Sequence, residues 1–120
     1  MTRILAVDDS PSMREMVSIA LRGAGFEVTP AVDGMSALKL AKESTYDLVL
    51  SDVNMPEMDG IALISALRAE PKYKHTPILM LTTESSPERK ADGKRAGATG
   101  WIVKPFDPEQ LVATMKRVLK

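Results

Sequence analysis

Short apolar runs alternate with segments of helical periodicity along the whole chain. Four apolar runs are continuous: Ile4–Val7, Leu48–Leu50, Ile78–Leu81 and Trp101–Val103. A fifth, Phe26–Thr29, is weaker because apolar and polar residues alternate in it. Continuous runs of this length are typical of strands that are covered on both faces. The pattern therefore predicts five strands, most of them buried in a sheet.

The segments between these runs predict five helices. Residues 11–22 carry Met13, Met16, Val17, Ala20 and Leu21 on one face, the stripe of an amphipathic helix. Further helices are predicted after Asp33, after Asp59, over 87–96 and from Pro108. Ser10, Asp33 and Asp59 are of the residue types that cap helix N-termini. The segment 87–96 is the weakest prediction, because it is highly charged and contains Gly93.

Strand followed by helix, repeated five times, predicts an α/β fold. Short loops between such elements imply parallel strands, right-handed crossovers and helices on both faces of a doubly wound five-stranded sheet. A length of 120 residues suits one domain, which we expect to span residues 1–120. The chain begins at Met and ends inside a helical pattern, so we expect no attached effector domain.

Composition removes several function classes. The 16 basic and 16 acidic residues balance, which argues against nonspecific binding to nucleic acid or to an anionic membrane. No apolar run approaches the roughly 20 residues of a membrane span, and no signal-peptide core is present, so we expect a cytoplasmic protein. The absence of Cys excludes disulfides, thiolate metal sites and a Cys nucleophile.

Charged and hydroxyl side chains follow the predicted strands. Asp8 and Asp9 come after the first, Asp52 after the third, Thr82 after the fourth and Lys104 after the fifth. Aspartate and threonine are also common helix caps in such loops. Capping does not explain an acidic pair, a third acid and a lysine at the same edge, so we expect these five to converge.

Three neighbouring carboxylates repel one another unless a cation neutralises them. Oxygen ligands without His or Cys favour Mg²⁺, which often completes its shell with phosphate. A carboxylate beside Mg²⁺ and Lys104 could attack a phosphoryl group, and Thr82 could donate a hydrogen bond to it. Asp52 stands alone after a central strand and is the better nucleophile, whereas Asp8 and Asp9 are suited to share the cation.

These motifs resemble the receiver domain of bacterial two-component response regulators, particularly the stand-alone chemotaxis type called CheY. The resemblance runs from Arg3 to Leu119 and rests on Val7-Asp8-Asp9-Ser10, the segment 51–60, Leu81-Thr82 and Lys104-Pro105-Phe106. It implies a flavodoxin-like (βα)5 fold with strand order 2-1-3-4-5. CheY is itself a known example of the rule that ligands bind at the carboxyl ends of parallel strands. The position of these residues therefore does not support the resemblance independently.

The resemblance implies that Asp52 accepts a phosphoryl group from a phosphohistidine. Asp9, Asp52 and the Asn54 carbonyl are implied as Mg²⁺ ligands, with Asp8 acting through water. Lys104, followed by a cis Pro105, and Thr82 are implied as contacts of the phosphoryl group.

Three further residues have implied regulatory roles. Trp101 stands where the family usually has Tyr or Phe, and it is expected to rotate inward as Thr82 moves toward the phosphoryl group. Asn54 and Glu84 are expected to tune the lifetime of the aspartyl phosphate. Trp is bulkier than Tyr, and a half-buried structural Trp is the alternative interpretation.

The resemblance also implies the partners. A sensor histidine kinase of the CheA type would donate the phosphoryl group, and a phosphatase is a further partner. The face of helix 4, strand 5 and helix 5 would then bind a flagellar motor switch protein or another target. We expect a monomer that catalyses only its own phosphorylation and dephosphorylation, and is otherwise not an enzyme.

Three other interpretations are weighed against this one. A phosphatase of the haloacid dehalogenase type carries Asp-x-Asp after its first strand and has a substrate cap, neither of which fits this chain. A flavodoxin-type flavin carrier needs a phosphate loop where Asp8 and Asp9 stand. A receiver acting as a phosphorelay intermediate or phosphate sink fits the sequence as well as motor control does.

Overall fold

A computed structural model of the chain describes residues 2–53, 55, 58–82, 87–104 and 106–119, in which strands and α-helices alternate. The strands are β1 (Arg3–Val7), β2 (Glu27–Ala31), β3 (Leu48–Asp52), β4 (Ile78–Thr82) and β5 (Gly100–Val103). The helices are α1 (Pro11–Gly23), α2 (Gly34–Glu43), α3 (Gly60–Arg68), α4 (Pro87–Ala96) and α5 (Pro108–Val118), and a 3-10 turn, Pro71–Tyr73, precedes β4.

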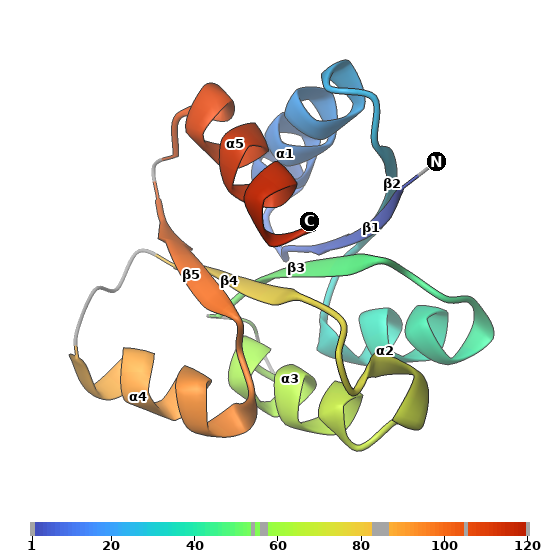
Figure 1. Cartoon of the computed structure of the whole chain (residues 1–120), viewed down its shortest axis with the longest axis vertical. Coiled ribbons are helices and arrows are strands. Elements are labelled where there is room, and N and C mark those ends of the chain that lie inside the picture. Colours follow the sequence, from blue (N-terminus) through green and yellow to red (C-terminus); the bar gives the residue numbers. More distant parts are fainter. Residues whose placement is uncertain (1, 54, 56–57, 83–86, 105, 120) are drawn as a thin grey trace.

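The strands form one parallel sheet in the order β2-β1-β3-β4-β5. Helices α1 and α5 cover one face, and α2, α3 and α4 cover the other (Figure 1). The predicted fold class, strand order and two-sided helical covering are therefore confirmed. Pro30 lies within β2, where it is tolerated because β2 is an edge strand that pairs on one side only.

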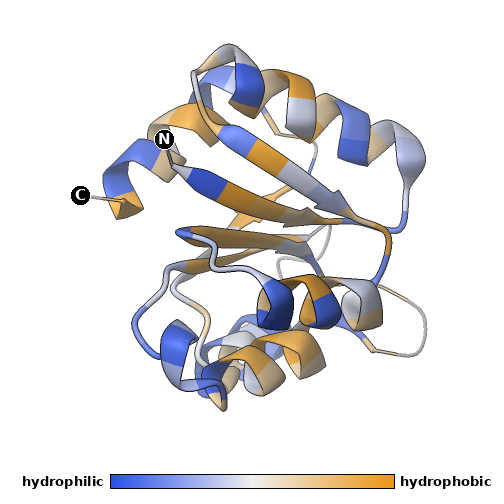
Figure 2. Ribbon diagram, turned by 90° about the vertical axis from the view of Figure 1, so that its right-hand side faces the viewer, coloured by the Kyte–Doolittle hydropathy of each residue, from blue (hydrophilic) through white to orange (hydrophobic). Residues whose placement is uncertain are grey.

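Two apolar cores lie on the two faces of the sheet, and Figure 2 shows the strands as hydrophobic bands between the helical layers. Leu5, Val49 and Met80 belong to the core under α2, α3 and α4, whereas Leu50 and Leu79 belong to the core under α1 and α5. Every residue of β3 and β4 is buried. This burial explains the continuous apolar runs in the sequence.

Capping side chains fix where three helices begin. The side-chain oxygens of Ser10, Asp33 and Asp59 accept hydrogen bonds from the backbone N–H groups of Met13, Ser36 and Ala62, at 3.3, 2.8 and 2.8 Å. These three caps were predicted and are confirmed. Because each cap directly precedes its helix, the chain turns sharply at the carboxyl edge of the sheet.

The weakest helix prediction is confirmed, whereas the predicted burial of one residue is wrong. Helix α4 is formed although its sequence gave the weakest helical signal, and Gly93 is its only buried residue among those the structure describes. Met16 was predicted to face the core but is 52% exposed. It lies at the margin of the α1 stripe and lines an open apolar hollow with Ile19 and Phe106, while Val17 and Leu21 fill the core.

None of the helices in the described ranges has the length and hydrophobicity that a membrane span requires.

Candidate functional site

Three carboxylates converge at the carboxyl edge of the sheet. Asp8 and Asp9 follow β1, and Asp52 is the last residue of the neighbouring strand β3. One oxygen of each carboxylate lies within 4.8 Å of the others. Asp8 and Asp52 are buried, whereas Asp9 is exposed. The predicted convergence of the three acids is therefore present in the structure.

Lys104, which directly follows the carboxyl end of β5, contacts this acidic cluster. Its Nζ lies 3.1 Å from Asp52 Oδ1 and 3.2 Å from Asp8 Oδ2, and donates a hydrogen bond to each. Its backbone N–H donates to the carbonyl of Thr82 at 2.7 Å, which extends the β4–β5 pairing by one residue. The sheet therefore holds the Lys104 backbone, and the two acids hold its ammonium group.

The environment of Lys104 keeps its side chain charged. Burial disfavours the ammonium, but the hydrogen bonds and Coulomb attraction to Asp52 and Asp8 outweigh that penalty, so the pKa of Lys104 lies above its ordinary 10.5. Only 12% of the Lys104 side chain is exposed, so solvent screens these attractions weakly. The site therefore retains a fixed positive charge next to Asp52 at neutral pH.

Asp8 forms hydrogen bonds through its backbone N–H, its backbone carbonyl and its carboxylate. Its N–H donates to the Ala31 carbonyl of β2 at 3.1 Å, and its Oδ1 accepts from the Ser10 N–H at 2.9 Å. Its carbonyl oxygen accepts a hydrogen bond from the Arg14 guanidinium at 2.7 Å. The turn from β1 into α1 is thus held in one conformation.

Sequence reasoning did not identify Arg14 as a residue near the cluster. A signal was available, because Arg14 lies near the N-terminal end of α1, where the helix dipole disfavours a cation that has no local partner. An arginine in that place suggests an acceptor nearby, which the structure identifies as the Asp8 carbonyl.

A glycine permits α3 to begin directly against the end of β3. A Cβ on Gly60 would collide with the backbone carbonyl oxygen of Asp52 and would lie 2.9 Å from Val53 Cα. The Gly60 N–H donates to the Val53 carbonyl at 2.9 Å, which closes the loop after Asp52. The loop therefore depends on the missing side chain at residue 60.

The remaining predicted site residues lie in two groups. Thr82 is buried at the end of β4, and Trp101 is 36% exposed on the edge strand β5. The Lys90 Nζ lies over the Trp101 ring, 5.1 Å from its centroid. Asn54, Glu84 and Pro105 lie outside the described residues, so their predicted roles in metal binding, phosphate lifetime and a cis peptide bond stay predictions.

The acidic cluster has the donor set of a hard divalent cation. All its side-chain ligands are carboxylate oxygens, which suit Mg²⁺, and two of the three acids are buried. Among the ion pairs that the described residues form, Lys104 brings one positive charge to three clustered carboxylates, which repel one another. Asp8, Asp9 and Asp52 therefore fit a Mg²⁺ ion.

Known proteins match this chain over nearly its whole length. The family model described as response regulator receiver domain matches residues 4–116. The chemotaxis protein CheY-3 of Vibrio cholerae serotype O1 is 40% identical over 119 residues, which cover 98% of this chain and 92% of that protein.

Solved structures agree with this match. The chemotaxis protein CheY4 of Vibrio cholerae is 56% identical, with a TM-score of 0.96 and 98% of each chain covered. The receiver domain of a sensor histidine kinase of Pseudomonas aeruginosa, described with a magnesium ion coordinated in its active-site cleft, is 29% identical. Its TM-score is 0.92, and the match covers 98% of this chain and 97% of that one.

Proposed function

The chain belongs to the response regulator receiver domain family, and from this premise we propose that it is a signalling switch operated by phosphorylation of Asp52. It is a two-component receiver with chemotaxis proteins among its relatives. Receiver domains bind Mg²⁺ in an acidic pocket, and Asp8, Asp9 and Asp52 form such a pocket here. The proposal assigns Asp52 as phosphoacceptor, with Asp8, Asp9, Asp52 and Asn54 holding Mg²⁺.

The contact between Lys104 and Asp52 carries this proposal. One carboxylate oxygen of Asp52 forms a bond to phosphorus, the bond from phosphorus to the donor histidine nitrogen breaks, and its electron pair remains on the imidazole. Lys104 lies within hydrogen-bond distance of Asp52 Oδ1 and stays protonated, so it can stabilise the charge on the transferring oxygens. A bound Mg²⁺ would add positive charge at the same place.

Thr82 and Trp101 are proposed as the residues that transmit the change. Thr82 ends the strand next to Lys104 and is placed to donate a hydrogen bond to the new phosphoryl group. Met80 is paired with Trp101, and Thr82 with Val103. Side chains in register, and those two residues apart along a strand, share a face of the sheet. Thr82 and Trp101 therefore lie on the same face, the one covered by α4.

The output surface is proposed to be α4, β5 and α5. Trp101 and Val103 are exposed on β5, and α4 contributes a strongly charged surface with Gly93 as its one buried residue among those described. The chemotaxis relatives support a flagellar motor switch protein as target and a CheA-type sensor histidine kinase as donor. The polar character of α4 favours a partner contact that relies on charge as well as on Trp101.

No substrate other than the donor is required by this chemistry. The chain is proposed to catalyse only the gain and loss of its own phosphoryl group, and a phosphatase would act as a separate partner.

Labelling with radioactive acetyl phosphate tests the proposal. Wild type should incorporate label in Mg²⁺ and lose most of that labelling in a chelator, and Asp52→Asn should not be labelled. Asp47→Asn is the matched control, because Asp47 precedes the same strand at the opposite edge, where its carboxylate accepts the Arg3 N–H at 2.8 Å. Labelling of Asp52→Asn at the wild-type rate would refute the assignment.

A further inference from the structure

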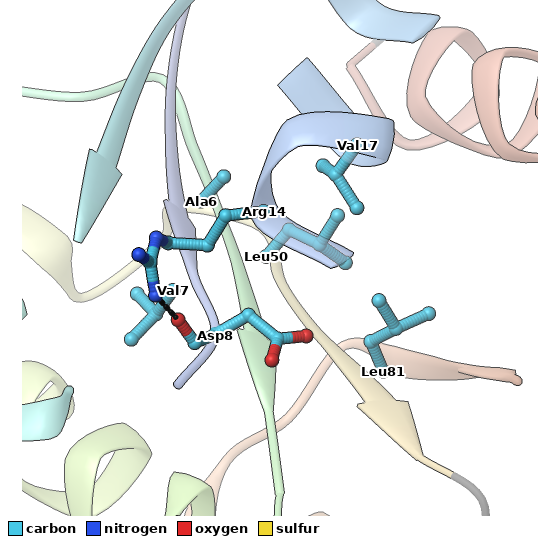
Figure 3. A pocket seen from close by; sticks show the side chains of 7 residues that line it. All are labelled: Ala6, Val7, Asp8, Arg14, Val17, Leu50 and Leu81. Atoms are coloured by element: carbon cyan, nitrogen blue, oxygen red, sulfur yellow. Dashed lines mark hydrogen bonds between the residues drawn. The ribbon is translucent and has the colours of Figure 1, made fainter. Parts of the chain in front are cut away.

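The side chain of Arg14, on the first turn of α1, reaches back to the turn that precedes the helix. Its Nη1 donates to the Asp8 carbonyl oxygen at 2.7 Å, across six residues of chain. Figure 3 shows the guanidinium meeting that carbonyl, while the Asp8 carboxylate points away to the other side. Arg14 therefore contacts the backbone of the acidic cluster and leaves the Asp8 carboxylate to Lys104 and Ser10.

The Asp8 carbonyl belongs to the peptide unit that carries Asp9. Because a peptide unit is planar, fixing the direction of this carbonyl restricts the position of the Asp9 Cα and the direction in which its side chain leaves the chain. Asp9 is exposed. The Asp8 carboxylate accepts hydrogen bonds from Ser10 and Lys104, whereas the Asp9 carboxylate has no hydrogen bond among the described residues. The position of the Asp9 carboxylate thus depends on its backbone.

The stem of Arg14 has a second contact, with the apolar layer behind the cluster. It lines a void of about 10 Å³ together with Val17, Leu50 and Leu81 (Figure 3). A void of this size is at the lower limit for one water molecule. Truncating Arg14 to Ala would enlarge the void, so a test of the guanidinium must keep the stem.

We infer that Arg14 is a positioning residue for the Mg²⁺ site: by holding the Asp8 carbonyl, it fixes the direction of the Asp9 carboxylate. The inference rests on the proposed function, because it concerns the same ion. Partners that hold a metal ligand in place typically change metal affinity by roughly 10- to 100-fold when they are removed. Arg14 acts here through the peptide, without touching the ion.

The alternative is that Arg14 merely stabilises the start of α1. Arg22 provides a matched control for this alternative, because it also lies on α1 and also donates to a carbonyl six residues away, that of Val28, at 3.1 Å. Arg22 is at the other end of the helix and contacts β2 rather than the cluster. Loss of either contact should lower stability, but only loss of the Arg14 contact should weaken Mg²⁺ binding.

Calorimetric titration of MgCl₂ into the unphosphorylated full chain tests the inference. Arg14→Met keeps the stem and is expected to raise the Mg²⁺ Kd by roughly 10-fold, with Arg22→Met unchanged from wild type. An equal Kd in Arg14→Met and wild type would overturn the inference, as would an equal weakening in both arginine variants. Thermal melting establishes that each variant is folded at the titration temperature.

The titration also separates a variant that fails to fold from a wild type that does not bind Mg²⁺. If Arg14→Met is unfolded, Arg14→Gln takes its place under the same criterion. If wild type itself does not bind Mg²⁺, the proposed function fails, and this inference fails with it; an unchanged Arg14 variant beside a Mg²⁺-binding wild type refutes only the inference.

Discussion

Lys104 supplies the positive charge that lets buried acids share one edge of the sheet. Its ammonium bridges Asp52 and Asp8, so it neutralises the proposed phosphoacceptor, and it would compete with a bound Mg²⁺ for the same oxygens. Removal of the Lys104 ammonium should therefore slow phosphoryl transfer but strengthen Mg²⁺ binding.

Lys104→Met tests this opposition. Without the ammonium, the carboxylates should bind Mg²⁺ more tightly, since a like charge has been removed from the site. The rate of phosphorylation at saturating Mg²⁺ should fall roughly 10²-fold, because one donor to the transferring oxygens is lost. Mg²⁺ titration and acetyl phosphate labelling measure the two effects. A variant that is labelled at the wild-type rate would show that Lys104 has no part in the transfer.

Tyr73 should make the folding stability depend on pH in the alkaline range. Burial raises the pKa of the Tyr73 phenol above its ordinary 10.0, and the hydroxyl lies 2.8 Å from the carbonyls of Ala41 and Ser44. The folded state thus favours the neutral phenol. Its contribution to stability is complete below the unfolded-state pKa of about 10 and is lost as pH rises through the higher folded-state pKa.

Tyr73→Phe should therefore be less stable than wild type at neutral pH, by about 1 kcal/mol for the lost hydrogen bond. The difference should shrink as pH rises above about 10, where wild type loses this stabilisation. Urea denaturation of both proteins across that range measures it. A difference that stays constant with pH would mean that the phenol does not titrate with the predicted shift.

The sequence identified the residues that act through charge but not those that act through backbone contacts. Asp8, Asp9, Asp52 and Lys104 could be predicted because parallel strands bring their carboxyl ends to one edge. Arg14 could not be assigned in the same way, since its partner is a carbonyl, and every residue has one.

At the scale of elements, α3 begins where β3 presents Asp52. The first residue of α3, Gly60, approaches the Asp52 and Val53 backbone so closely that any Cβ would displace one of them. This close approach therefore couples the position of Asp52, the proposed phosphoacceptor, to the position of α3.

Gly60→Ala should disturb both stability and chemistry. Overpacking against rigid backbone is expected to cost about 1–3 kcal/mol of unfolding free energy, and the shift of Asp52 should slow labelling. Gly23→Ala is the control, because nothing lies within 4 Å of the added Cβ, and it should be neutral or stabilising by up to about 1 kcal/mol. Urea denaturation measures both variants; equal stabilities for the two would contradict the steric argument.

Helix α4 and β5 form the element pair on which the proposed output depends. The chain has a single Trp, so its fluorescence reports Trp101 alone. The ring is partly exposed and lies under the Lys90 ammonium, an environment that a rotation toward the sheet would change.

Phosphorylation should therefore change the intensity or the emission wavelength of Trp101. Asp52→Asn under the same conditions should show no change. Thr82→Ala should accept the phosphoryl group but give a smaller change, because the proposed movement of Thr82 is missing. An emission spectrum that is identical before and after phosphorylation of wild type would count against the Trp101 switch.

Helix α4 also marks a limit of pattern-based prediction. Its position between two strands indicated a helix, but its residues lack an apolar stripe, and the fit of Gly93 against Met80 became visible only in the structure. Met16 is the opposite case, because its spacing matched a core stripe while α5 leaves it uncovered. The weak signal of α4 and the wrong burial predicted for Met16 both arise where packing between elements, rather than periodicity within one, decides burial.

For the whole molecule, the five-stranded sheet separates two cores and places all the proposed chemistry at one edge. The order β2-β1-β3-β4-β5 puts β1 and β3 side by side, which brings Asp8 and Asp52 together, and puts β5 at the border, where Trp101 can meet a partner. The alternation of strands and helices predicted the layers, and the family resemblance predicted the strand order.

A relay intermediate and a motor regulator differ in what the phosphorylated chain does next. In both proposed roles the first step is phosphorylation of Asp52, the claim on which the proposed function depends.

Mass spectrometry of the chain after incubation with a phosphorylated histidine kinase and Mg²⁺ tests that claim most directly. Wild type should gain the mass of one phosphoryl group, located by fragmentation on residue 52, and Asp52→Asn should keep its original mass. A folded, Mg²⁺-binding wild type that gains no such mass, or that carries it at another residue, would contradict the account.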